Sequence, residues 1–166
     1  NIQALLTLYF SLVRSRLEYA AIIWYPIYQV HISHIEKIQR KFLKFLAYLC
    51  DGIYPPQGSD HAVLLKRFNC NSLSTRRSIQ TVKFLHNILN NEMECSYILN
   101  RIPFLVPRIN SRNSLTFYCP KYRTNVLLKA PVSLMCNHFN LIRYHCDINY
   151  DSLKHLIDIT IHILKT

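Results

Sequence analysis

Apolar residues dominate the start of the chain and predict one long helix from residue 4 to about residue 24. At about 100° per residue, the polar positions of this segment form one narrow stripe, made by Gln3, Thr7, Ser11, Arg14 and Glu18. Most of the remaining circumference is apolar, so this helix is expected to be largely buried. Pro26 is expected to end it, and residues 25–30 would form the connection to the next element.

A second helix with two contrasting faces is predicted from residue 31 to about residue 49. One side carries apolar residues at helical spacing, namely Ile32, Ile35, Ile38, Phe42, Phe45 and Leu49. The opposite side carries Lys37, Arg40, Lys41 and Lys44 within an arc of about 100°. Because a short turn joins the two helices, we expect them to form an antiparallel helical hairpin.

The segment 51–60 is the best candidate for a domain boundary, because it contains both glycines of the chain and a Pro-Pro pair. The sequence therefore predicts a helical hairpin at 1–50, a linker at 51–60 and a smaller helical extension at 61–166. Within the extension we expect helices at 61–68, from Ser72 or Ser74 to about 90, at 95–102, at 133–145 and at 152–164, with Asp151 capping the last. Residues 103–131 are expected to be irregular, with a short strand at 115–118. The predicted fold class is all-α.

Composition supports a folded helical protein. Half of the 166 residues are apolar and 17% are charged, so the chain should fold rather than remain disordered. With only two glycines, phosphate-binding loops and barrels are disfavoured, and no segment matches a dinucleotide fingerprint or a P-loop. The six cysteines form no closely spaced pair and no signal peptide is recognisable, so we expect reduced thiols in an intracellular protein, cytoplasmic or nuclear. No apolar run has the length needed to span a membrane.

Charge points to a polyanionic partner. The formal net charge is +11, with 20 Lys and Arg against 9 Asp and Glu, and each phosphate that a cation neutralises releases counterions. No acid lies between Glu94 and Asp147. The cations of this stretch are Arg101, Arg108, Arg112, Lys121, Arg123, Lys129 and Arg143. The aromatic residues interleaved with them are Phe104, Phe117, Tyr118, Tyr122 and Tyr144. Cations and rings together are typical of single-stranded nucleic-acid contacts. For each ring, placement in the core is the preferred interpretation; for the cation set, nucleic acid is preferred over a merely solvated surface.

The basic face of the second predicted helix could follow a sugar-phosphate backbone without reading sequence; the alternative is an ordinary solvated face. Glu36 and Arg40, four residues apart, are expected to pair and to remove one cation from this face. Arg16 falls within the apolar circumference of the first helix, if that helix is straight. A guanidinium buried there needs a carboxylate or a phosphate as partner.

No catalytic or metal site is expected. Two-metal phosphoryl transfer needs acids that converge on the ions, and the acids here are few and scattered. A structural zinc site usually takes its ligands from closely spaced pairs that flank a turn. The candidate ligands are irregularly spaced within predicted helices: His31, His34, Cys136, His138, His145 and Cys146.

Five stretches resemble, in the same order, the C-terminal part of the reverse transcriptase of jockey-like non-LTR retrotransposons. They are SLVRSRLEYAAIIWYPIY from Ser11, IEKIQRKFLKFL from Ile35, LSTRRSIQTVKFLHNILN from Leu73, VPRINSRNSLTFYCPKYRTN from Val106 and APVSLMCNHFN from Ala130. Together they cover most of the chain. The Leu-Glu-Tyr, Trp and Pro positions of the first stretch are the most diagnostic.

The resemblance implies a thumb followed by a C-terminal extension, which would contact template–primer duplex, RNA or target DNA. The palm aspartates, the fingers and the endonuclease are absent, so this chain would bind without catalysis, and Mg²⁺ would belong to a palm supplied elsewhere in the same polyprotein. The expected nucleic-acid-binding residues are Arg16, Lys37, Arg40, Lys41, Lys44, Arg108, Arg112, Lys121 and Arg123. Two alternatives remain open at this point: a purely structural brace for the missing palm, and a decayed element without present function.

Overall fold

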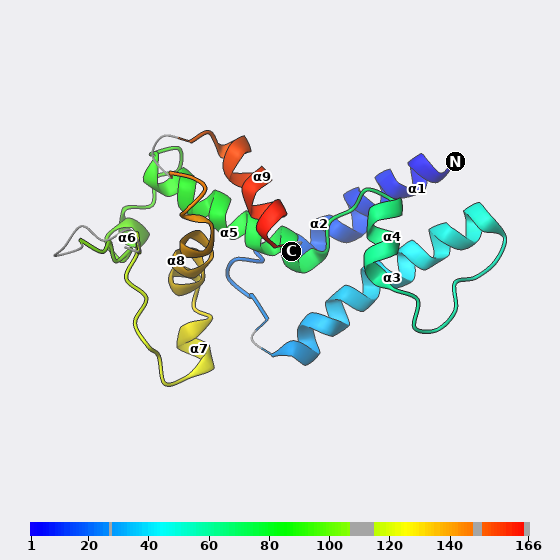
Figure 1. Cartoon of the computed structure of the whole chain (residues 1–166), viewed down its shortest axis with the longest axis horizontal. Coiled ribbons are helices and arrows are strands. Elements are labelled where there is room, and N and C mark those ends of the chain that lie inside the picture. Colours follow the sequence, from blue (N-terminus) through cyan, green and yellow to red (C-terminus); the bar gives the residue numbers. More distant parts are fainter. Residues whose placement is uncertain (27, 107–114, 148–150, 165–166) are drawn as a thin grey trace. The chain divides into compact units, whose positions relative to one another are not determined.

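The computed structural model describes residues 1–26, 28–106, 115–147 and 151–164, and these are almost entirely helices and their connections (Figure 1). The predicted all-α class is confirmed. The only β pairing among the described residues is an isolated antiparallel bridge between Phe104 and Phe117. The chain divides into two compact units, residues 1–77 and residues 78–166.

The first helix begins at the N-terminus as α1 (Ile2–Leu8), continues through a π-helical segment, η1 (Tyr9–Arg14), and ends with α2 (Ser15–Glu18). The predicted extension to residue 24 is wrong. The helix ends because Tyr19 is extended, with a ψ of 125°, and Ala20 takes a left-handed φ of 50°. The indole N–H of Trp24 then donates to the Tyr19 carbonyl over 2.6 Å, which stabilises a compact turn in place of further helix.

Burial of this first helix also differs from the expectation. Leu6 and Tyr9 are buried, but Leu8 is 53% exposed and Leu12 is 59% exposed. Arg16, expected among apolar neighbours, is exposed as well. A π-helical turn closes over one residue more than an α-helical turn. The positions after Tyr9 are therefore rotated away from where a straight α-helix would place them.

Helix α3 (Gln29–Asp51) confirms the second predicted helix and runs antiparallel to α1 and α2 (Figure 1). Its buried face is not the predicted one, because Ile38, Phe45 and Leu49 are exposed. The side chains that are buried are Gln39, Leu43, Leu46 and Ala47. The Gln39 side-chain amide donates to the Asn71 carbonyl over 3.0 Å, which lets a polar residue occupy the centre of the packed face.

Helix α4 (His61–Arg67) packs on α3, with Asp60 as its N-cap. Leu64 of α4 joins Leu6 of α1 and Leu43 of α3 in one apolar cluster. The 51–60 segment therefore connects two helices of the same unit, which differs from the division expected from the sequence. Its glycines serve turns, since Gly52 ends α3 with a φ of 70° and Gly58 has a φ of 90°.

Helix α5 (Leu73–Leu89) begins in the first unit and continues into the second. Ser72 caps it by accepting the backbone N–H of Thr75 over 3.1 Å. The second unit also contains α6 (Ser96–Leu99), α7 (Asn125–Leu128), α8 (Pro131–Ile142) and α9 (Leu153–Ile163). Helix α7 was not predicted. The cap of α9 is Ser152, which accepts the His155 N–H, whereas Asp151 accepts the Asp147 N–H.

The core of the second unit lies among α5, α8 and α9 and includes Leu85, Phe139 and Leu156. Phe117 is fully buried against Phe139, and the Asn140 side chain bonds the Phe117 backbone on both its N–H and its carbonyl. The predicted strand at 115–118 is a single bridge, in which Leu105 donates to the Thr116 carbonyl and Tyr118 donates to the Pro103 carbonyl, while the Asn140 amide takes both backbone groups of Phe117.

Candidate nucleic-acid interface

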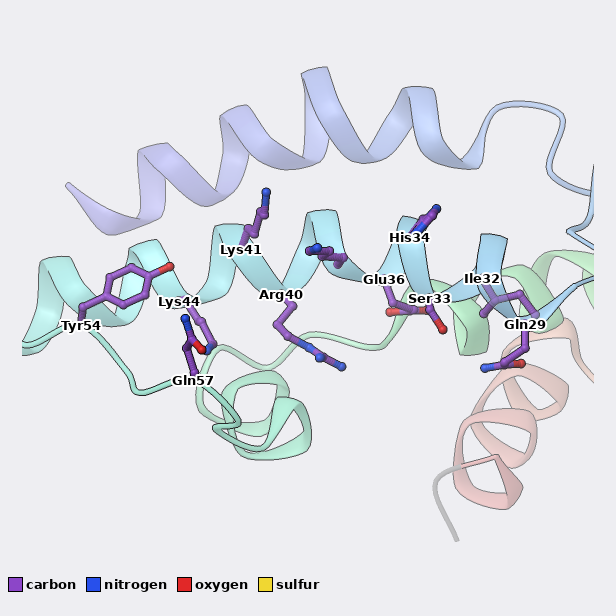
Figure 2. A pocket seen from close by; sticks show the side chains of 11 residues that line it. Gln29, Ile32, Ser33, His34, Glu36, Arg40, Lys41, Lys44, Tyr54 and Gln57 are labelled. Carbon is purple, nitrogen blue, oxygen red and sulfur yellow. The ribbon is translucent and has the colours of Figure 1, made fainter.

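The four predicted cations of α3 line one open groove of about 780 Å³: Lys37, Arg40, Lys41 and Lys44. Figure 2 shows Arg40 and Lys44 extending toward the side of α3 where Gln57 lies, while Lys41 and His34 extend on the other side of the ribbon. The first three cations are exposed and Lys44 is half-buried. The groove thus presents cationic groups along about two turns of one helix.

The loop 51–60 forms the second wall of the groove through Tyr54 and Gln57. Lys44 holds this loop, because its Nζ donates to the Pro56 carbonyl over 2.9 Å. The Tyr54 ring lies 6.2 Å from the Tyr48 ring of α3 and remains 55% exposed. One of the four cations therefore shapes the groove, and the other three remain available to a ligand.

Glu36 lines the same groove but does not neutralise it. The expected Glu36–Arg40 pair is not formed, because the carboxylate of Glu36 is committed to the start of α5. It accepts the Ser74 N–H over 2.6 Å and the Leu73 N–H over 3.4 Å, and it lies 3.8 Å from the Arg77 guanidinium. Burial acts to raise its pKa, but the His61 imidazole at 3.8 Å, the bonds from the α5 backbone and the charge of Arg77 hold the pKa of Glu36 below its usual value.

The other acids of the first unit are engaged in the same way. Glu18, at the end of α2, binds Arg76 of α5 in a bidentate pair and lies 3.8 Å from Arg14. Asp51 binds Arg67 bidentately at 2.6 Å, and Asp60 caps α4. Within the described chain, Lys37, Arg40 and Lys41 consequently form no ion pair with an acid.

Arg16 does not line the groove, and its exposure removes the argument that it needs a buried partner. The deeply buried guanidinium is Arg77, which is 1% exposed, with Glu36 at 3.8 Å and the Tyr25 ring at 5.8 Å. Sequence reasoning missed this arginine. A signal was present, because Arg76 and Arg77 follow closely on the start of a helix, where the helix dipole disfavours cations unless acids compensate them.

The second predicted strip lies in the second unit, and it is a different kind of surface. Lys121 and Arg123 are exposed, while Arg108 and Arg112 lie outside the described residues. Two other arginines of the acid-free stretch lie over tyrosine rings: Arg101 over Tyr97 at 4.3 Å and Arg143 over Tyr144 at 4.0 Å. This strip therefore combines cations with exposed rings.

The aromatic residues of this stretch divide between core and surface. Phe117 is core, as preferred for each ring, and Tyr122 is half-buried. Phe104 and Tyr118 are 55% and 53% exposed. The Tyr144 hydroxyl accepts a bond from Arg143. The exposed rings are the ones that remain available for stacking.

The described residues offer little reactive chemistry. These residues contain no group of three His, Cys, Asp or Glu side chains that could hold a metal ion. All six cysteines are free thiols, and burial raises the pKa of Cys136 to about 12 and of Cys146 to about 11, so neither is a thiolate near neutral pH. In the part of the chain described, no helix has both the length and the apolar character needed to cross a bilayer.

Comparison with known proteins finds no match to a family model, to a curated protein or to a solved structure.

Proposed function

We propose that this chain binds the sugar-phosphate backbone of nucleic acid through the groove of α3, as the non-catalytic thumb and C-terminal part of a jockey-like non-LTR reverse transcriptase. The ligand would be template–primer duplex, or the DNA target, held without sequence preference. Lys37, Arg40 and Lys41 would contact phosphates, and Lys44 would keep the 51–60 loop in position. The palm and fingers would be supplied by the rest of the polyprotein.

The observation that carries this proposal is that the acids of the first unit pair with arginines other than that of α3 or cap a helix, which leaves the α3 cations without an acidic partner among the described residues. Its acids hold Arg14, Arg67, Arg76 and Arg77 and the helix starts, and the α3 cations remain uncompensated on one arc. Like charges gathered in one groove repel each other. A polyanion removes that repulsion and releases counterions at the same time.

A second candidate, a structural brace for a palm domain, is favoured by a separate observation. Leu8 and Leu12 of the first helix are more than half exposed. Exposed apolar surface of this kind is typical of a helix that packs on another domain. The two roles do not exclude each other, because they use different residues.

The decisive experiment is fluorescence-anisotropy binding of a labelled primer–template duplex across a salt series. The test variant replaces Lys37, Arg40 and Lys41 by Gln, which removes charge without adding acids. The matched control replaces Lys66, Lys83 and Lys154, three exposed lysines that do not line the groove, by Gln. We expect the test variant to lower the slope of log K against log salt by about 2 to 3, and the control to change it far less.

Equal loss in the two variants would mean that only net charge matters, and the groove would not be the site. If the folded wild-type chain did not bind duplex at low salt, the structural-brace hypothesis would be favoured. Circular dichroism of each variant establishes that the helices are intact.

A further inference from the structure

The second unit contains a pocket of about 430 Å³ that shares no lining residue with the α3 groove. Residues of three segments line it: α6 with the residues that follow it, the stretch 118–122, and the start of α8. Among them are Tyr97, Arg101, Tyr118, Tyr122 and Cys136. The volume falls in the range of about 300–1,000 Å³ that is usual for small-ligand sites.

The walls of this pocket are preformed. Pro103, Pro120 and Pro131 contribute to the lining, and each fixes its own backbone φ. The Ser133 hydroxyl donates to the Tyr122 hydroxyl over 3.2 Å, which ties the 118–122 stretch to α8. Cys136 is buried at 1% exposure as a neutral thiol, so part of the pocket lining is apolar.

The opening carries rings and a cation. Tyr97 is 67% exposed and Tyr118 is 53% exposed, and the Arg101 guanidinium lies 4.3 Å from the centre of the Tyr97 ring. No acid occurs in the sequence between Glu94 and Asp147, so no local carboxylate from this stretch competes for the cation. The pocket therefore suits a flat apolar group that is joined to an anion.

We propose that this pocket takes an unpaired base of single-stranded nucleic acid, stacked on Tyr97 or Tyr118, with Arg101 at the neighbouring phosphate. Stacking on aromatic side chains and cation contacts to phosphates are the two general means by which proteins bind single strands. The inference rests on the proposed function because it takes nucleic acid as the partner. It adds a second site, in the second unit, for a single-stranded part of the ligand. A proline-rich peptide would fit the rings but would leave Arg101 and the acid-free surroundings without a role.

The test compares two labelled single strands of equal length on the full chain, oligo(dT) and a strand of abasic sites, by fluorescence anisotropy. Both present the same phosphates, so their difference in affinity measures contacts to bases. We expect oligo(dT) to bind roughly tenfold more tightly. Changing Tyr97 and Tyr118 to Leu should remove this difference, and changing both to Phe should preserve it.

The matched control changes Tyr19 and Tyr28 to Leu, since both are exposed tyrosines that do not line the pocket; it should bind like wild type. The Gln variant of Lys37, Arg40 and Lys41 should lose duplex affinity and keep the preference for oligo(dT), which separates the two sites. Equal affinity of wild type for the two strands overturns the base pocket and leaves the duplex result standing. Tyrosine-dependent binding of a decaproline peptide in place of oligo(dT) overturns it as well.

Discussion

The two cation-rich regions of the molecule differ in what accompanies the charge. On α3 the cations lie along one helical arc, with a backbone carbonyl holding Lys44 and the nearest acid, Glu36, engaged elsewhere. In the stretch 95–146, two arginines lie over tyrosines, and further rings are exposed. Regularly spaced cations suit the uniform backbone of a duplex, whereas cations that lie over rings suit unstacked bases. Positive charge alone, which both regions carry, would not have separated them.

The largest loss of stability is expected at one of two neighbouring aromatic residues, Phe117 and Tyr118, and comparing their substitutions tests this contrast. Phe117 is fully buried, so Phe117→Ala should destabilise the second unit by about 3–5 kcal/mol. Tyr118 is 53% exposed, so Tyr118→Ala should change stability by less than about 0.5 kcal/mol while weakening single-strand binding. Denaturant unfolding, followed by circular dichroism, measures both. Similar losses for the two variants would mean that the exposed rings are part of the core and that the base pocket is not open.

Much of the helical fold was predictable from the sequence because helix signals are local. Apolar periodicity and Ser72 located α5, and the Gly52 position marks the end of α3. The errors came from tertiary contacts. The π-helical segment rotates Arg16 out of the place assigned to it, and the Gln39 bond to Asn71 moves the buried face of α3 toward a polar residue.

The candidate site shows the same division. The arc of α3 cations follows from helix geometry alone and lines one groove as the spacing implied. The partner of Glu36 could not be predicted. Arg40 lies four residues away, but the carboxylate instead bonds the start of α5, which begins 37 residues further along the chain. Tyr97 lies in the acid-free stretch, but it was not among the predicted rings, because only the fold brings it together with Tyr118 in one pocket.

A smaller effect tests whether the acids of the first unit are structural. Glu36 bonds the first turn of α5 and faces Arg77, so Glu36→Gln should lower the free energy of unfolding by about 2–3 kcal/mol. Affinity for duplex should change little, provided that the variant is measured while folded. If Glu36 instead neutralised Arg40, the substitution would leave stability unchanged and increase duplex affinity.

The pH dependence of stability in wild type and Glu36→Gln tests the role of the Glu36 carboxylate independently. The folded pKa of Glu36 lies below its ordinary value of 4.5, with burial opposing the shift and the nearby His61 imidazole and the bonds from the α5 backbone producing it. The unfolded chain then binds the proton more readily, so the stabilisation is complete above the unfolded pKa and is lost as pH falls through the folded one. The stability difference between wild type and Glu36→Gln should therefore shrink below about pH 4.5. A constant difference across pH 3–7 would contradict a role for the charged carboxylate.

The smallest effect is expected at Asp51, the exposed counterpart of Glu36. Its bidentate pair with Arg67 lies in solvent and holds the pKa of Asp51 below its usual value through the Arg67 bond. Exposed pairs stabilise weakly and are screened by salt. Asp51→Asn should therefore shift the urea midpoint less than Glu36→Gln does, and the shift should diminish further at high salt. Both variants add one net positive charge to the first unit, so their difference isolates the effect of burial. A larger or salt-independent effect at Asp51 would mean that the exposed pair stabilises the first unit more than the contacts of Glu36 with α5 do.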